Sequence, residues 1–297
     1  MRLRRFASVC CLSLAGAALV SAQAPTGAPA SPTAKEQKAL DGIKGKIEGK
    51  IAWSSSRSNA KHDIWIMNAD GTDQKQFTKS DNVDWFSRIS PDGSRVVFCR
   101  SKMGWVNEMD AEMNDKWDIW MINADGSGET KVADDAAWPN WRPSGDSIVF
   151  ARGAKVFIKS LNSGDETEIF DAGTSLKKGA YSQQSELSPN GRFLAITVRG
   201  AMRQTGMWDR EKNVWNSFGA GCQINWFPCG TRVLRMNEGG GNGGTEVLAF
   251  NVAPEGKPVQ PVSGISIPKA VRFMDLPGRR SHEYFPKMSP CGKYMVW

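Results

Sequence analysis

Histidine is scarce in this chain, with 2 residues among 297. Catalytic zinc sites and related metal centres usually draw two or three of their ligands from histidine. His62 and His282 lie far apart in the sequence and have no defined carboxylate partner. Metal enzymes that hold their ion through several histidines are therefore excluded, and we expect no cofactor.

Several catalytic motifs are also missing. No Gly-x-Ser-x-Gly pentapeptide occurs, so these residues contain no nucleophile elbow of the α/β-hydrolase type. The glycine-rich run from Gly239 to Gly244 is followed by neither Lys-Ser nor a helical pattern, which excludes a phosphate-binding loop. We expect no catalytic residues and no enzyme, although a glycosidase with two dispersed carboxylates stays open because such a pair is defined only in the fold.

A strong excess of one charge is absent as well. The formal net charge is +7, and removal of the N-terminal Arg2, Arg4 and Arg5 would leave 35 of the 38 basic residues against 31 acidic ones. Basic and acidic residues are interspersed along the remaining chain. We therefore expect no nucleic-acid partner.

The N-terminus has the pattern of a secretory signal peptide over residues 1–24. Three arginines precede an apolar run from Val9 to Val20, and Ala22-Gln23-Ala24 is a small-residue cleavage site. The run is shorter than the roughly 20 residues that a spanning helix needs. We expect cleavage near Pro25, no stable membrane anchor, and a periplasmic or extracellular location.

Residues 25–45 are expected to form a disordered linker. From Pro25 to Ala34 the chain contains only Ala, Pro, Thr, Gly and Ser, which cannot bury enough apolar surface to order themselves. Residues Lys35 to Lys50 could form a short helix or a first strand.

Four cysteines follow the signal segment, namely Cys99, Cys222, Cys229 and Cys291. An oxidising compartment would permit disulfides between them. No Cys-x-x-Cys spacing occurs, so a structural zinc site or a thioredoxin-like motif is not indicated. Buried free thiols and one or two disulfides both fit the sequence.

One unit recurs five times: an apolar or aromatic residue, then x-Pro-x-Gly, two further residues, and a mostly apolar strand. The turn prolines are Pro91, Pro143, Pro189, Pro228 and Pro290. Proline fixes φ at the first corner of a turn and glycine accepts a positive φ at its end, so each copy predicts a β-hairpin. The spacing between copies is that of one four-stranded blade each, which predicts an all-β protein with the β-propeller architecture.

A second hairpin follows in the early copies. The sequence from Asp63 to Thr72 reads Asp-Ile-Trp-Ile-Met-Asn-Ala-Asp-Gly-Thr, and Asp118 to Ser127 repeats it closely. Together with Ser-Pro-Asp-Gly-Ser-Arg-Val-Val-Phe at Ser90 to Phe98, this resembles the TolB-type, WD40-like β-propeller repeat. The resemblance covers roughly Ile51 to Trp297 and implies a propeller of periplasmic or extracellular type, which we place at residues 46–297.

The resemblance implies six blades, with the last blade truncated at the end of the chain. A five-bladed ring is the alternative. Unlike TolB proper, the chain has no α/β domain between its signal segment and the propeller, which puts a role in a Tol-Pal system in doubt. Asn190, Cys229 and Cys291 stand where the family prefers Asp.

In a propeller, the loops between second and third strands share one face with the loops between blades, and ligands usually bind on this face or in the central channel. The expected loops include Arg199 to Met207 and Pro254 to His282. The candidate partner-binding residues on or beside such loops are Arg57, His62, Trp85, Trp105, Glu108, Asp110, Glu112, Asp115, Trp138 and His282.

Each candidate also has a simpler interpretation. The loop with Trp105 and its carboxylates could hold Ca²⁺ or a cationic peptide, but it lacks the glycine of an EF-hand and fits an ordinary solvated loop. Trp85 and Trp138 fit packing between blades as well as an aromatic binding surface. The two histidines could meet across the ring closure or be ordinary surface residues.

The sequence therefore predicts an exported scaffold that binds an envelope protein, a peptide or a carbohydrate through its loop face. The propeller domain of a cell-envelope hydrolase, either a glycosidase or a peptidase, is the alternative. Carboxylates that converge in the channel would favour the hydrolase, and an aromatic loop face would favour the scaffold. The sequence does not indicate the oligomeric state.

Overall fold

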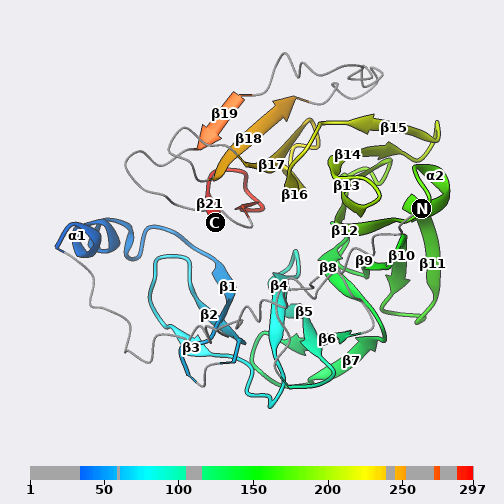
Figure 1. Cartoon of the computed structure of the whole chain (residues 1–297). Helices are drawn as coiled ribbons and strands as arrows, with labels where there is room; N and C mark the ends of the chain where they lie inside the picture. Colours follow the sequence, from blue (N-terminus) through cyan, green and yellow to red (C-terminus); the bar gives the residue numbers. More distant parts are fainter. Residues whose placement is uncertain are drawn as a thin grey trace, which may run out of the picture.

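The computed structural model describes residues 34–58, 61–104, 116–238, 245–251, 271–274 and 286–296. Over these residues the chain is an all-β protein whose antiparallel sheets are arranged radially around a common centre (Figure 1). This is the β-propeller architecture that the repeats predict.

Six sheets occur in the described part of the chain. The first sheet contains β1 (Lys50–Ser55), β2 (Asp63–Asn68) and β3 (Lys75–Gln76). The second contains β4 (Asp84–Ile89), β5 (Arg95–Ser101), β6 (Trp117–Asn123) and β7 (Thr130–Ala133). The third contains β8 (Ala137–Trp141), β9 (Ser147–Arg152), β10 (Lys155–Ser160) and β11 (Glu166–Asp171).

The fourth sheet follows a short helix, α2 (Ala172–Ser175), and contains β12 (Ala180–Leu187), β13 (Phe193–Gly200), β14 (Gln204–Asp209) and β15 (Val214–Ser217). The fifth contains β16 (Cys222–Trp226), β17 (Arg232–Glu238), β18 (Thr245–Asn251) and β19 (Val271–Met274). The sixth contains β20 (Lys287–Met288) and β21 (Met295–Val296). Whether the ring closes with six blades or five stays a prediction.

All five Pro-x-Gly units form the predicted hairpins. They join β4 to β5, β8 to β9, β12 to β13, β16 to β17 and β20 to β21. The turn glycines have φ values between +68° and +74°, a region that residues with a Cβ atom rarely adopt. In the first copy the Asp92 carboxylate accepts hydrogen bonds from the hydroxyls of Ser90 and Ser94, and these bonds lower the pKa of Asp92.

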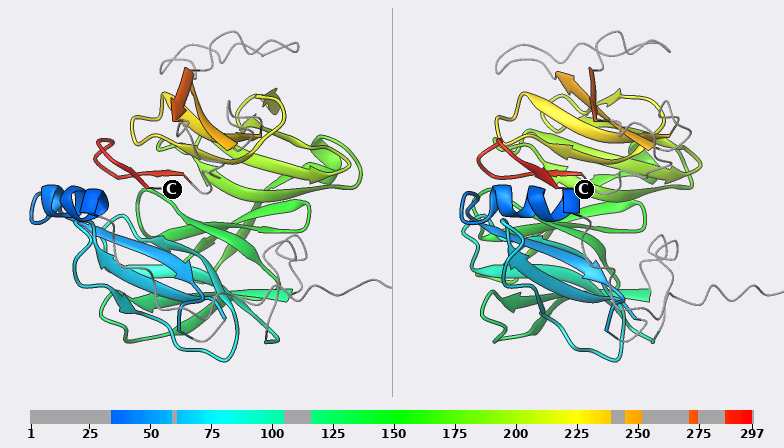
Figure 2. Two further views of the ribbon diagram at one scale, coloured as in Figure 1. Left: turned by 60° about the vertical axis from the view of Figure 1, so that its left-hand side comes forward. Right: turned by 90° about the vertical axis from the view of Figure 1, so that its left-hand side faces the viewer.

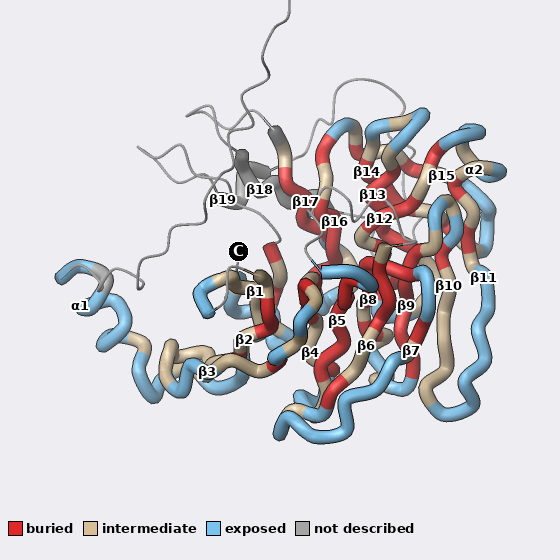
Figure 3. The backbone as a smooth tube through the Cα atoms, turned by 60° about the horizontal axis from the view of Figure 1, so that its bottom comes forward, coloured by how far each residue is buried: buried red, intermediate tan, exposed pale blue. Residues whose placement is uncertain are grey.

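The core lies between neighbouring sheets. One cluster joins the second and third sheets through buried side chains that include Val97, Ile119, Ile148 and Phe150. Figure 3 shows the inner and middle strands buried, whereas the outer strands β7 and β11 carry more exposed residues. This pattern follows from strands that are covered by sheets on both faces.

Two of the expected loops are shorter than predicted. Strand β14 begins at Gln204, inside the range Arg199 to Met207, and β19 lies inside the range Pro254 to His282. In the first case Thr205 is a polar residue that is fully buried, and its backbone pairs with Thr197. A polar residue in a buried strand breaks the apolar pattern by which strands are recognised.

Helix α1 (Ala34–Ile43) lies beside the first sheet at the edge of the molecule (Figures 1 and 2). The predicted disordered linker therefore does not extend over this stretch, and the short helix that Lys35 to Lys50 could form is present. Its Lys, Glu, Gln, Ala and Leu residues are strong helix formers. The backbone N–H of Gly45 donates to Asp70 Oδ2 at 2.8 Å and so ties the end of this segment to the β2–β3 turn.

The four cysteines in the described residues are free thiols. Cys99 is buried in the second sheet, and burial raises the pKa of its thiol to about 12. Cys229 and Cys291 occupy the same position in two of the turns and are exposed. Of the two readings that the sequence left open, the structure shows the one without disulfides.

Candidate functional site

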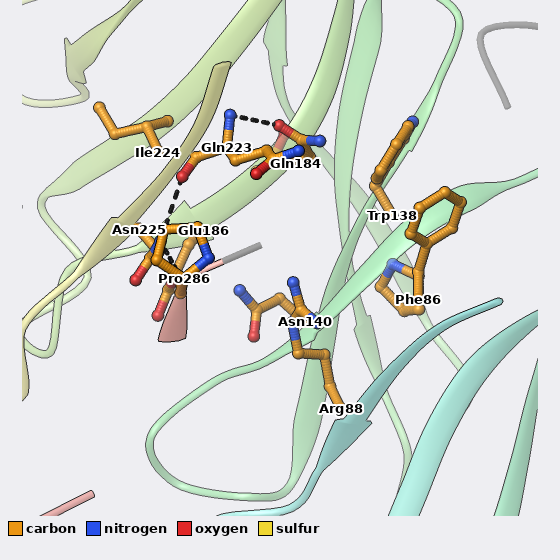
Figure 4. A pocket seen from close by; sticks show the side chains of 12 residues that line it. Phe86, Arg88, Trp138, Asn140, Gln184, Glu186, Gln223, Ile224, Asn225 and Pro286 are labelled. Carbon is orange, nitrogen blue, oxygen red and sulfur yellow. Dashed lines mark hydrogen bonds between the residues drawn. The ribbon is translucent and has the colours of Figure 1, made fainter. Parts of the chain in front are cut away.

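The innermost strand of each blade faces the central channel, and a cavity lies there (Figure 4). Its lining comes from β4, β8, β12 and β16 together with Pro286. These strands belong to repeat units that are far apart in the sequence. The cavity is therefore a product of the radial arrangement of the sheets.

An aromatic row runs from the loop face to this cavity, and we define it as His62, Trp85, Phe86 and Trp138. The rings of His62 and Trp85 stack with centroids 4.2 Å apart, and those of Phe86 and Trp138 are 4.0 Å apart. Trp85 and Phe86 connect the two pairs at 5.6 Å. His62 immediately precedes β2, and the other three residues lie within the first three positions of β4 or β8, which places the row near the loop face.

The row contains three of the predicted residues, His62, Trp85 and Trp138, and adds Phe86, which the sequence did not single out. Burial lowers the pKa of His62 and outweighs the opposing effect of the Asp63 charge, which favours the neutral imidazole. The buried indole N–H groups of Trp85 and Trp138 have no hydrogen-bond acceptor among the described residues. Buried indole N–H groups usually have a partner.

Four inner strands share a backbone irregularity at the cavity. Phe86, Trp138, Gln184 and Gln223 have φ values of +55°, +62°, +49° and +57°. Each lies at a register shift between the first and second strands of its sheet. Such conformations cost on the order of 1–3 kcal/mol each for residues other than glycine and tend to cluster at functional sites. All four side chains line the cavity.

A ring of polar side chains lies two residues further along these strands. We call Arg88, Asn140, Glu186, Asn225 and Lys287 the channel ring, because each stands three residues before the turn proline of its repeat. Lys287 Nζ lies 2.6 Å from Glu186 Oε1, which links the sixth sheet to the fourth. Burial lowers the pKa of Lys287, and the nearby Arg88 charge acts in the same direction.

Two tryptophans of the repeat fix the backbone of the channel ring. The indole N–H of Trp141 donates to the carbonyl oxygen of Arg88 at 2.9 Å, and that of Trp226 donates to the carbonyl oxygen of Glu186 at 3.1 Å. Each bond joins an inner strand to that of the preceding sheet. The aromatic residue before x-Pro-x-Gly therefore sets the position of the ring residue in the neighbouring blade.

Arg57 does not join the aromatic row. Its guanidinium carbon lies 4.8 Å from the ring centroid of Trp65 and 5.5 Å from that of Trp53, and its nitrogens donate to Ser55 and Gln74. These contacts lie within the first sheet and its loops, and a binding role for Arg57 stays a prediction. A guanidinium within about 6 Å of a tryptophan ring centroid is attracted by the negative face of the ring.

The remaining candidates lie outside the described residues: Trp105, Glu108, Asp110, Glu112, Asp115 and His282. The Ca²⁺ site considered for that loop stays a prediction. Among the residues that the structure describes, no cluster of three His, Cys, Asp or Glu side chains could hold a metal ion. In the same part of the chain, no helix has the length and apolar character of a membrane span.

Known proteins resemble this chain mainly in fold. No protein-family model matches the sequence. A stretch of 118 residues is 26% identical to an uncharacterized protein of Agrobacterium fabrum, and it covers 38% of this chain and 39% of that protein.

Among solved structures, TolB from Acinetobacter baumannii is similar with a TM-score of 0.58 and 14% identity, over 88% of this chain and 60% of that chain. A puromycin-hydrolyzing peptidase of Mycobacterium tuberculosis is similar with a TM-score of 0.50 and 14% identity, over 81% of this chain and 38% of the peptidase. The chain therefore spans less than two thirds of the length of each of these relatives. The likeness establishes the architecture, and the chain has a TolB-like β-propeller fold.

Proposed function

We propose that this chain is an exported scaffold, periplasmic or extracellular, that binds a protein, peptide or carbohydrate partner at the loop face without turnover. The observation that carries the proposal is the aromatic row, whose Trp85 and Trp138 indole N–H groups lack acceptors among the described residues. Amide carbonyls of a peptide and hydroxyls of a sugar are acceptors of the right kind. Tryptophan is also among the residue types that contribute most to binding surfaces.

The charges around the cavity also favour a scaffold over a glycosidase. A glycosidase needs two carboxylates that flank the bond it cleaves. Glu186 is the one acidic residue among the described residues that line the cavity, and it is already paired with Lys287. The fold likeness to a peptidase, over 38% of the peptidase chain, keeps the propeller domain of a hydrolase as the alternative.

The test is to screen the purified full-length protein on peptide and glycan arrays and then to titrate the best ligand with variants. We expect Trp85→Ala to weaken binding by about tenfold or more, as for an aromatic at the centre of an interface. Tyr294→Ala is the matched control, because Tyr294 is an exposed aromatic (44%) that directly follows the Pro-x-Gly turn between β20 and β21, at the other end of the strands from the loop face.

Equal affinity of Trp85→Ala and wild type, or no binding on either array, would contradict the proposal. Mass spectrometry of the bound ligand gives the second readout. A ligand recovered intact supports a scaffold, and a cleaved ligand supports the hydrolase.

A further inference from the structure

Arg88 is a channel cation that forms no ion pair with any of the described residues. Its Nη1 donates to the carbonyl oxygen of Ser87 at 3.0 Å, and its Nε is shielded from solvent without an acceptor among the described residues. Among the described residues no carboxylate lies within ion-pair distance of Arg88. The charge of Glu186 acts on Arg88 from farther away, and Glu186 itself pairs with Lys287. Removing a guanidinium from water without a partner is costly, and burial accordingly lowers the pKa of Arg88.

The charges of the channel ring leave room for one anion. Two cations, Arg88 and Lys287, face the single carboxylate of Glu186. The formal charge of the ring is therefore +1. One carboxylate from a ligand would neutralise it and would give Arg88 the partner it lacks.

Polar groups that could complete such a site already line the cavity. Ser185 is 1% exposed and its Oγ has no hydrogen-bond partner among the described residues. Figure 4 shows Arg88 and Asn140 next to each other in the lining, across the cavity from Glu186 and Asn225. Buried polar groups in native proteins are nearly always satisfied, so unsatisfied donors that share a cavity point to an absent ligand.

We infer that the central channel contains a carboxylate-binding subsite, in which the Arg88 guanidinium is the anchor and Ser185 and Asn140 complete the donor set. Arginine suits this role because its planar fork binds both oxygens of a carboxylate. The subsite lies two residues along the strands from Phe86 and Trp138, about 7 Å deeper than the aromatic row. It does not require that a partner bind at the loop face.

The carboxylate can come from a small free acid or from the C-terminus of a peptide. The experiment is isothermal titration of the full chain with succinate, with the tripeptide Ala-Ala-Ala, and with the same tripeptide as its C-terminal amide. Binding of both acids assigns the site to free carboxylates. Binding of the tripeptide acid alone assigns it to a peptide C-terminus.

We expect Arg88→Gln to weaken acid binding by about tenfold or more, the usual loss for a hydrogen bond to a charged group. Arg88→Lys keeps the positive charge but lacks the planar guanidinium, so acid binding should weaken less than in Arg88→Gln. Arg152→Gln is the matched control, because Arg152 pairs with Glu166 on the outer strand of the third sheet and does not line the cavity, and this variant should bind like wild type.

Thermal unfolding supplies a readout that does not depend on calorimetry. The bound acid should raise the Tm of the wild type and should leave that of Arg88→Gln unchanged, because a ligand stabilises only the state that binds it. The inference is overturned if neither acid binds at millimolar concentration. It is also overturned if the amide binds as well as the acid, or if Arg88→Gln binds like wild type. None of these results bears on array binding at the loop face, which tests the scaffold proposal separately.

Discussion

Substitution of Asp84 tests whether a buried ion pair holds the inner strand of the second blade. Arg100 Nε and Nη2 lie 2.7 and 2.9 Å from the two carboxylate oxygens of Asp84. The Arg100 and Asp84 side chains are 9% and 0% exposed. Glu129 binds the other side of the guanidinium at 2.6 Å and is 34% exposed. Asp84 immediately precedes Trp85, so the pair also positions the aromatic row.

The expected loss of unfolding free energy depends on which charged group each substitution leaves buried without a partner. Removing one partner of a buried ion pair costs about 3–5 kcal/mol. We expect Asp84→Ala to lower the free energy of unfolding by about 3 kcal/mol, the lower end of this range, because Glu129 still pairs with Arg100. For Arg100→Met we expect a loss of up to about 5 kcal/mol in unfolding free energy, because this variant leaves the Asp84 carboxyl buried without a cation. Burial already raises the pKa of Asp84 despite the adjacent guanidinium.

The assay is urea unfolding at pH 7, followed by tryptophan fluorescence. Glu129→Gln is the control and should cost less than about 1 kcal/mol, since a pair with a partly exposed partner contributes little. The double variant Asp84→Leu/Arg100→Met should recover part of the loss, because it leaves no unpaired charge. The reasoning is refuted if Asp84→Ala costs less than about 1 kcal/mol, or if Glu129→Gln costs as much as Asp84→Ala.

Three further predictions concern the tryptophan bonds, acid sensitivity and packing. Trp141→Phe keeps the ring but removes the hydrogen bond to the neighbouring inner strand, and we expect a loss of about 1 kcal/mol in urea unfolding. The Arg152 guanidinium lowers the pKa of Glu166 below its usual 4.5. The stability from this pair is therefore present above pH about 4.5 and is lost as the pH falls through the lower folded-state pKa. Glu166→Gln should flatten that decline in unfolding free energies measured from pH 6 to about 3, and an unchanged slope would contradict the assignment. A Cβ atom on Gly206 would lie 2.4 Å from the carbonyl oxygen of Asn216. Gly206→Ala should therefore lower the unfolding free energy by about 1–3 kcal/mol. An unchanged midpoint of urea unfolding would contradict this close packing.

The hairpins were predictable because their signals are local. Proline and glycine at fixed positions dictate the turn geometry within five residues, and the structure has all five hairpins where the repeat places them. Strand β14 was partly missed, because the buried Thr205 looks like a loop residue when only polarity is considered.

The site was only partly predictable because it depends on contacts between separate sheets. His62, Trp85 and Trp138 could be chosen from the sequence as loop-face residues, but their contact through Phe86 requires three adjacent sheets. Glu186 and Lys287 are 101 residues apart, and nothing local in the sequence brings them together. One signal did exist, since every channel-ring residue lies three positions before its repeat proline.

That fixed offset separates the part of each repeat that builds the fold from the part that can vary. The turn and its flanking strands need Pro, Gly and apolar residues, whereas the ring position holds Arg, Asn, Glu, Asn and Lys in successive copies. The bonds from Trp141 and Trp226 reach the backbone of ring residues and not their side chains. The identity of a ring side chain can therefore change without loss of these bonds. For this reason we propose that the ring residues determine the ligand preference of the channel. Substitution of Arg88, which forms no ion pair with a described residue, tests this directly.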